Sequence, residues 1–533
     1  MSCTTILVGR RASYDGSTIV ARNEDSPGGQ FDPKRMQVVL PEDQPHIYTT
    51  VCSHLTIELP DDPMRYTSVP NALPDEGIWA SAGFNSANVG MSATETIASN
   101  ERVLGADPLV TLVPAVGVKG EEGYAPEVPG GLGEEDLVTV VLPYINSARE
   151  GVKRLGALLE RYGTYEMNGI AFSDVDEIWW LETVGGHHWI AKRVPDDSYV
   201  TMPNQSGIDW FDLADAEGDQ IDHMASPDLR EWMTAHHLDL TMRDVPPFDE
   251  DEDAWGFDDD DEIDAMDGDI EIDPARALDI FNPRDAFGTS TDSDRVYNTP
   301  RAWDMQRVLN PHDGWEGPLA SYGTESGDIP WSRVPERKVT IEDVKYVLSL
   351  HYQGTPFDPY GKLGDAATRS LYRPIGINRN SQLAVLQLRP YLPESHRAIQ
   401  WMAFGSNVFN ALVPLYANVD EMPEYLSNTT GRVTTENFYW ANRLIAALAD
   451  ARFRDNSAHI ERYREKIGGM GHRMLHETDS RVADLPASEI PAQLAEANGR
   501  MAAQLRDETD SLLSKVLFTT SLAMRNAFAM SDN

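Results

Sequence analysis

The sequence predicts an α+β protein with antiparallel strands over most of its length and helices at its end. Short strand-prone segments joined by tight turns recur as far as about residue 419, and apolar residues at helical spacing dominate after about residue 430. Strands followed by a run of helices are typical of α+β folds. The chain has 533 residues, of which 41% are hydrophobic, so it can form two to four average domains or one large domain with attached elements.

The first element is a predicted β-hairpin. Thr4–Val8 is strand-prone, the residues at 13–16 have turn chemistry, and 17–21 runs back as a second strand. Further strands are expected at 36–40 and 48–59, and the segment 78–94 is expected to form two strands around the turn Asn85–Asn88.

The middle of the chain predicts one helix and a strand meander. Val152, Leu155 and Leu159 lie on one face of a helix expected at 144–162, which Gly163 would end. Four strands with tight turns are expected to follow, at 169–173, 178–183, 189–193 and 199–202.

A strand-rich block at 372–419 contains strands expected at 382–388 and 398–404, and helices follow it. Gly468, Gly469 and Gly471 are expected to interrupt the helical pattern. The last helix carries an apolar stripe of Leu494, Met501, Leu505, Leu512 and Val516. We expect residues 3–430 to form the main domain, with 431–533 as a helical region packed on it or at a subunit interface of a homo-oligomer.

The formal charge of −42 argues against nucleic acid and anionic membranes as partners. A dense acidic run at 249–273 predicts a solvated insertion of the main domain at about 245–275. With only two cysteines we expect no disulfide framework, which suits a reducing compartment, and the start of the chain lacks the pattern of a secretory signal. No stretch is apolar for long enough to span a membrane, so we expect a cytoplasmic protein.

Cys3 is the residue that most sharply indicates chemistry. If residues 1–2 were removed, the Cys3 α-amine would lie beside its own thiol and could act as its base. A free cysteine has a pKa of about 8.5 and an α-amine one of about 8, so the two groups can exchange a proton near neutral pH. Removal of Met1 alone would leave Ser2 on the amine, so maturation needs a second cleavage.

Arg22 and Asp25 lie at the end of the returning strand, near the start of the strand that carries Cys3. A guanidinium beside the thiol would favour the thiolate, and a carboxylate could hold the N-terminal ammonium.

The motifs around these residues resemble the dipeptidase A family of N-terminal-cysteine peptidases, which is related to penicillin V acylases and bile salt hydrolases. The matching segments cover most of the chain, less securely after about residue 420. They are Cys3–Gly9, Asp15–Ser17, Ala21–Asp25, Gly83–Asn85, Trp179–Glu182, Gly186–Arg193, Pro203–Gln205, Thr299–Trp303, Gly354–Pro356 and Tyr372–Pro374.

The resemblance implies a four-layer αββα sandwich of two antiparallel sheets, the N-terminal nucleophile hydrolase fold, with additional C-terminal helices. It implies hydrolysis of dipeptides without a cofactor, with Cys3 as nucleophile and Arg22 and Asp25 beside it. Asn204 would complete the oxyanion hole and Arg301 would support the site. Asn85 would line the substrate pocket, whereas Asn88, where relatives commonly have glycine, fits a left-handed backbone conformation.

Two other functions are also compatible with the sequence. An acylase or amidase with the same centre would cleave non-peptide C–N bonds, and a protein of this fold could also be non-catalytic. A metal site at His187–His188 is not expected, because neighbouring strand residues point to opposite faces. Cys52 has no companion ligand and is expected to pack in the interior.

Overall fold

The computed structural model describes residues 3–28, 30–73, 77–238, 240, 279–315, 317 and 320–524. The segment 1–2, which we expect to be removed, and the acidic insertion predicted at about 245–275 lie outside these residues. Within the described ranges, no helix combines the length and apolarity that a bilayer span requires.

The larger sheet has seven antiparallel strands, and β1 lies near its middle between β12 and β2. The hairpin expected at the chain start is confirmed, and its second strand continues to Asp25. In spatial order the strands are β16 (Ser332–Arg333), β12 (Tyr199–Met202), β1 (Cys3–Val8), β2 (Thr18–Asp25), β17 (Asn380–Leu388), β18 (Ala398–Phe404) and β19 (Val413–Tyr416).

The second sheet has six antiparallel strands and contains the predicted meander. The strand pair expected around residues 85–88 is also confirmed, and Asn88 has the left-handed φ of 58° that its position predicted. The strand order is β14 (His223–Ala225), β11 (His188–Arg193), β10 (Ile178–Val184), β9 (Asn168–Ser173), β8 (Gly90–Thr96) and β7 (Ala82–Phe84).

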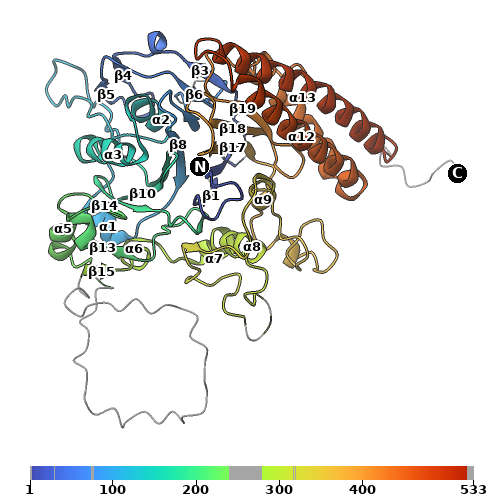
Figure 1. Cartoon of the computed structure of the whole chain (residues 1–533). Helices are drawn as coiled ribbons and strands as arrows, with labels where there is room; N and C mark the ends of the chain where they lie inside the picture. The colour runs from blue at the N-terminus through green and yellow to red at the C-terminus, as the bar shows by residue number, and fades with distance from the viewer. Residues whose placement is uncertain are drawn as a thin grey trace.

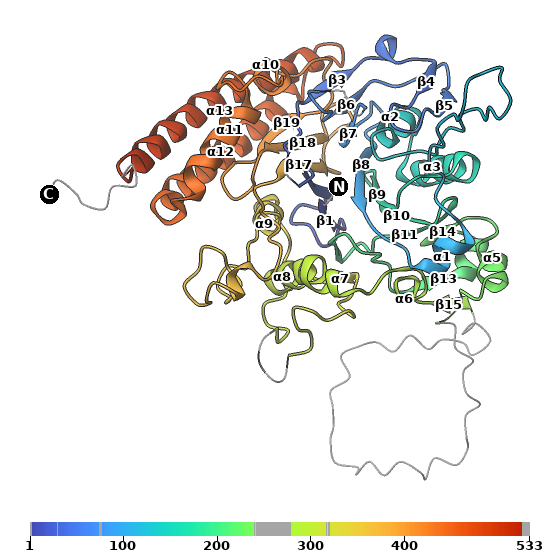
Figure 2. The ribbon, with the colours of Figure 1, turned by 180° about the vertical axis from the view of Figure 1, so that it is seen from behind.

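The two sheets pack against each other, and helices cover them on opposite sides. Strands β1 and β2 contact β8 in the other sheet, and β2 also contacts β9. Helix α3 (Ala148–Tyr162) lies against β9, β10 and β11 and ends at Gly163, whose φ of 68° suits a glycine cap. Figures 1 and 2 both show β1 between α3 on one side and α12 and α13 on the other.

The C-terminal helices pack on the edge of the larger sheet. Helix α11 (Phe438–Asp450) contacts β18, and α12 (Phe453–Val482) and α13 (Ile490–Ser521) contact β19. The apolar stripe predicted on the last helix is confirmed, because all five of its residues are buried.

The expected interruption at Gly468, Gly469 and Gly471 is wrong, since α12 runs through all three glycines. One of them has a packing reason. A Cβ at Gly471 would stand 2.7 Å from the Pro414 ring, so only glycine allows α12 to approach β19 this closely.

Short elements connect the two sheets, and most of their helices were not anticipated. One of them, α8, begins at Thr299 with a proline in its first turn and lies against β12. The short strands are β3 (Gln37–Val39), β4 (Ile47–Thr49), β5 (Thr56–Glu58), β6 (Tyr66–Ser68), β13 (Phe211–Asp212) and β15 (Ile280–Phe281). The short helices are η1 (Pro41–Asp43), α1 (Glu101–Ala106), α2 (Leu137–Val141), η2 (Leu142–Tyr144), α4 (Leu213–Glu217), α5 (Leu229–Ala235), α6 (Pro283–Phe287), α7 (Asp292–Tyr297), α8 (Thr299–Leu309), α9 (Ile341–Val347), η4 (Thr368–Ser370) and α10 (Glu424–Ser427).

Candidate active site

Cys3 begins β1 and is fully buried between the two sheets. In the hairpin register Cys3 lies opposite Glu24, and Thr5 lies opposite Arg22. Because side chains alternate along strands, all four of these residues share the face of the sheet that meets β8. Arg22 uses this position to donate a hydrogen bond from Nη1 to the Cys3 Sγ at 3.2 Å.

The Arg22 guanidinium is held by the opposing sheet. Its Nε donates to Ser92 Oγ at 3.0 Å, its Nη1 to the Thr94 carbonyl at 2.9 Å, and its Nη2 to the Ser81 carbonyl at 3.1 Å. Burial alone would lower the pKa of this group, but the neighbouring Cys3 and Glu24 outweigh burial and raise it. Arg22 is therefore a fixed cation aimed at the sulfur.

The thiol nonetheless stays protonated at neutral pH. Burial raises the pKa of Cys3 to about 12, and the nearby Arg22 offsets only part of that rise. Arg22 favours the thiolate, as expected, but loss of solvation outweighs it. Any attack by this sulfur needs a base that takes its proton during the reaction.

Asn204, in the turn after β12, contacts the main chain of Cys3. Its Oδ1 accepts from the Cys3 nitrogen at 3.1 Å and from Arg301 Nη2 at 2.8 Å. Its Nδ2 donates one hydrogen bond, to the Thr96 carbonyl at 2.9 Å. Because arginine has donors but no acceptors, Arg301 fixes which end of the amide faces Cys3.

Arg301 projects from α8 and joins the site together. It is fully buried, and burial lowers its pKa to about 10. Its guanidinium donates to the carbonyls of Cys3 and Pro203, and Nη1 also donates to Thr4 Oγ1 at 2.8 Å. Arg301 therefore ties the start of β1 to the turn that carries Asn204.

Asp25 lies one residue beyond the partner of Cys3 on β2, with its side chain on the other face of the sheet from Arg22. Its carboxylate forms an ion pair with the buried Arg373 and accepts a hydrogen bond from Asn380 Nδ2. The structure thus places Asp25 near the start of β1 but records its contacts with Arg373 and Asn380, not with the sulfur.

Asn85 is not brought to this cluster. Its Nδ2 donates to the carbonyls of Leu142 at 2.9 Å and Ile145 at 2.7 Å. Its Oδ1 accepts from the backbone nitrogens of Ala87 and Val89, both at 3.0 Å. These bonds use both donors and the acceptor of the amide to build the β7–β8 turn, so we leave Asn85 out of the proposed site.

Glu95, on β8, belongs to the site and was missed in the sequence. It is fully buried, with Oε2 accepting from Thr5 Oγ1 at 2.7 Å and Oε1 accepting from the Asn204 nitrogen at 2.9 Å. Burial raises its pKa to about 8. A glutamate in a strand of small buried residues was the available signal, since an acid in such a strand needs a specific partner.

The His187–His188 pair does not behave as two residues of one strand. His187 lies in the turn before β11, and both Nδ1 atoms contact the Asp107 carboxylate, at 2.9 and 2.7 Å. Alternation therefore did not separate the two rings as expected. Even so, no cluster of three or more potential metal ligands occurs among the residues that the structure describes. The expected burial of Cys52 is wrong, because this cysteine is exposed.

Comparisons with known proteins agree with the motifs around Cys3. The sequence profile of peptidase family C69 matches residues 2–466. A dipeptidase of Bifidobacterium longum (strain NCC 2705) is 58% identical, and a probable dipeptidase A of Streptococcus pyogenes serotype M3 (strain SSI-1) is 50% identical; each comparison covers the full length of both chains. The dipeptidase A of Lactobacillus helveticus is 40% identical over 97% of this chain and 96% of its own. The chain therefore belongs to peptidase family C69, the dipeptidase A family that its motifs indicated.

Proposed function

We propose that this protein is a cysteine dipeptidase that uses the Cys3 thiol as nucleophile and the Cys3 α-amine as base. One observation carries the proposal: the two reactive atoms of a single residue each have a dedicated partner. Arg22 Nη1 contacts the sulfur at 3.2 Å, and Asn204 Oδ1 contacts the main-chain nitrogen at 3.1 Å. The names of the relatives support dipeptides as the substrates.

The first step of the proposed mechanism needs no preformed thiolate. As the sulfur attacks the scissile carbonyl carbon, the thiol proton passes to the α-amine of Cys3. Asn204 Oδ1 orients that amine as a hydrogen-bond acceptor, and Arg22 stabilises negative charge that develops on the sulfur. The C–N bond then breaks, and the ammonium returns its proton to the leaving amino acid.

The Asn204 amide also supports an oxyanion role. Its Oδ1 faces Cys3 and Arg301, and one hydrogen of Nδ2 goes to Thr96. Among the described residues the second Nδ2 hydrogen has no acceptor, so it is available to the carbonyl oxygen of the tetrahedral intermediate, together with a main-chain donor. Such a donor typically contributes about 3 to 4 kcal/mol to the transition state. Water then hydrolyses the thioester with the amine of Cys3 as base.

The mechanism requires a free amine, so we propose that the Cys3 thiol attacks the preceding carbonyl carbon. The Ser2–Cys3 peptide bond then breaks as the thiol proton passes to the Cys3 nitrogen, and water hydrolyses the resulting thioester to release residues 1–2. Two face-to-face antiparallel sheets with helices outside support assignment to the αββα fold of N-terminal nucleophile hydrolases. We further propose residues 3–430 as the catalytic domain, residues 431–533 as its helical extension, a cytoplasmic location and a homo-oligomeric assembly. Light scattering of the purified protein tests the last of these.

The test of the activity is a side-by-side assay of a dipeptide panel and a set of N-acyl amides. A dipeptidase cleaves the dipeptides at least tenfold faster, as kcat/KM. Faster cleavage of N-acyl amides would replace it with an acylase. No turnover of either, by protein whose chain begins at Cys3, would favour a non-catalytic role.

A further inference from the structure

A hollow of about 300 Å³ lies between α9 and α12, on the far side of the larger sheet from the Arg22 guanidinium. Its apolar wall includes Ile341, Trp401 and Leu412, and its polar lining includes Glu342, Arg464 and Glu465. A volume at the low end of the range for ligand sites suits a molecule of few atoms. None of these residues takes part in the proposed mechanism.

Two glycines of α12, Gly468 and Gly469, line this hollow and have open space beside them. A Cβ built on Gly468 or Gly469 would meet no atom within 4 Å, whereas one on Gly471 would collide with Pro414. A glycine inside a helix costs about 1 kcal/mol relative to alanine. Close packing against Pro414 requires glycine at Gly471, but no packing contact requires glycine at Gly468 or Gly469, which both line the hollow.

Two basic side chains that form no ion pair within the described residues line the hollow. Arg464 donates from Nε to the Asn410 carbonyl at 2.9 Å and from Nη2 to the Asn407 carbonyl at 2.6 Å. Within the described part of the chain, its Nη1 has no hydrogen bond and the residue has no ion pair. Lys345, which also lines the hollow, donates to Ser349, Asn407 and Asn410 and likewise has no acidic partner within the described residues.

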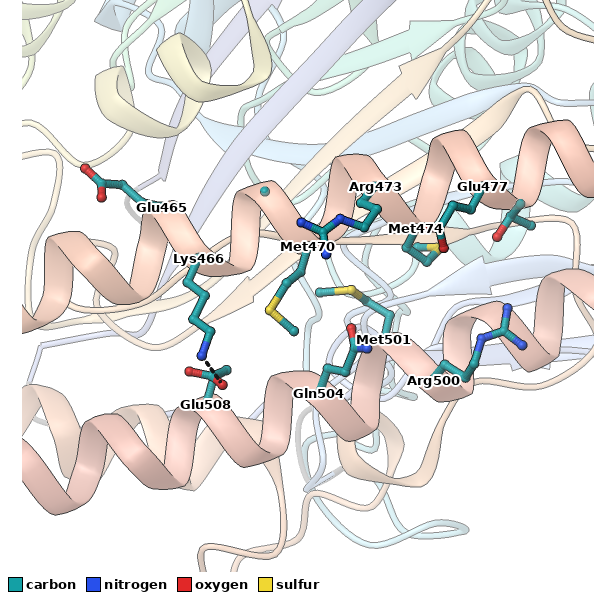
Figure 3. Close-up of a pocket in the computed structure, with 12 residues that line it drawn as sticks. Glu465, Lys466, Met470, Arg473, Met474, Glu477, Arg500, Met501, Gln504 and Glu508 are labelled. Carbon is teal, nitrogen blue, oxygen red and sulfur yellow. Dashed lines mark hydrogen bonds and ion pairs between the residues drawn. The ribbon is translucent and has the colours of Figure 1, made fainter.

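Two carboxylates also line the hollow. Glu342 pairs with His472 at 2.6 Å, while Glu465 is exposed and has no ion pair within the described residues. Glu465 also lines the groove between α12 and α13 that Figure 3 shows, in which Lys466 is paired with Glu508 at 2.6 Å. The hollow behind α9 thus offers an unpaired guanidinium, an unpaired carboxylate and an apolar wall.

We propose that this hollow binds a free α-amino acid with an apolar side chain. Arg464 Nη1 receives the α-carboxylate, Glu465 receives the α-ammonium, and the side chain lies against Trp401 and Leu412. A zwitterion can engage both the guanidinium and the carboxylate, whereas a ligand with one charge can engage only one of them, so a zwitterion fits best. The inference goes beyond the proposed function and does not depend on it.

Calorimetric titration of the full-length Cys3→Ala protein with L-leucine tests the proposal. We expect saturable binding to one site per chain, and binding at least tenfold weaker for L-leucine amide and for N-acetyl-L-leucine, each of which lacks one charge. Gly468→Leu fills the open space and should weaken L-leucine binding tenfold or more. Gly499→Leu is the matched control: it is also a helical glycine with open space around its Cβ, but on α13, and it should bind L-leucine as before.

Two results would overturn the proposal. One is the absence of saturable binding up to millimolar L-leucine. The other is equal binding by the Gly468→Leu and Gly499→Leu proteins, which would assign the ligand to another site, including the product subsite at Cys3. Hydrolysis by proteins that keep Cys3, with and without Gly468→Leu, is assayed separately, so a failure of the proposed function would be seen independently of this result.

Discussion

The two cysteines of this chain have similarly raised pKa values but contrasting surroundings. For both, loss of solvation raises the pKa of the thiol to about 12. Around Cys3 the next influence is the cation Arg22, which lowers the pKa, whereas around Cys52 it is the carboxylate of Glu135, which raises it further. Cys3 is buried between two sheets, and Cys52 lies at the surface.

This contrast shows that the pKa of a thiol does not by itself identify the nucleophile. What distinguishes Cys3 is the set of partners that distant parts of the chain deliver to it. Arg22 comes from the next strand, Asn204 from the turn after β12 and Arg301 from α8. A positioned base and oxyanion donor can activate a thiol that is neutral at rest.

The largest expected effect separates the two thiols directly. Cys3→Ala should lower kcat for dipeptides by roughly four orders of magnitude or more, because the nucleophile and its reaction path are lost. Cys52→Ala is the control and should retain wild-type kcat/KM. Circular dichroism checks that both proteins are folded. Equal activities in the two variants would remove the distinction between the cysteines.

A smaller effect tests the partner of the Cys3 amine. Asn204 has a φ of 66°, so glycine removes its side chain without straining the backbone. Asn204→Gly should reduce kcat by roughly 10² to 10³, the usual effect of losing an oxyanion donor. Asn88→Gly, with a φ of 58° in the β7–β8 turn, is the matched control and should leave kcat within twofold. Steady-state kinetics would contradict the assignment if both variants lost activity equally.

Replacing Glu135, the acidic neighbour of Cys52, should change the reactivity of the Cys52 thiol by a smaller factor. Glu135→Gln lowers the pKa of the Cys52 thiol, so its alkylation by iodoacetamide at pH 8 should become severalfold faster. Peptide mass spectrometry follows Cys52 separately from Cys3. An unchanged rate would mean that exposure of the sulfur, and not Glu135, sets its reactivity.

The smallest effect concerns the stability that Glu95 contributes near Cys3. Its pKa is about 8 in the folded chain against an ordinary value of 4.5, so the folded state keeps a proton that the unfolded state releases. Stability from this group therefore falls as pH rises from about 4.5 to 8 and is constant above that. Because a glutamine side chain cannot titrate, the Tm of Glu95→Gln minus that of the wild type should increase by a few degrees from pH 5 to pH 8. A difference independent of pH would contradict the raised pKa.

Local sequence patterns predicted many strands and helix ends well, because these features depend mainly on residues close together in sequence. The strand at Tyr199–Met202 has the predicted bounds, and Gly163 ends α3 as expected. Four of the six predicted site residues, Cys3, Arg22, Asn204 and Arg301, come together in one hydrogen-bonded cluster. Their spacing in the family motifs carried that information.

Features that depend on contacts between residues far apart in sequence were harder to predict. Glu95 gains its position from Thr5 and Asn204, which no local pattern links to it. Asn85 is held in the β7–β8 turn because its side chain donates hydrogen bonds to the carbonyls of Leu142 and Ile145, which are distant in sequence. Gly471 fits the pattern of a helix breaker, but a glycine is needed there because the Pro414 ring of β19 leaves no room for a Cβ. The local sequence pattern does not show a contact between residues so far apart in the chain.

The central claim is that the Cys3 amine is free in the active protein. Intact mass and N-terminal sequencing of purified protein that hydrolyses dipeptides test it most directly. We predict a chain that begins at Cys3. An active chain that still begins at Met1 or Ser2 would contradict the claim, because the base of the proposed mechanism would be blocked.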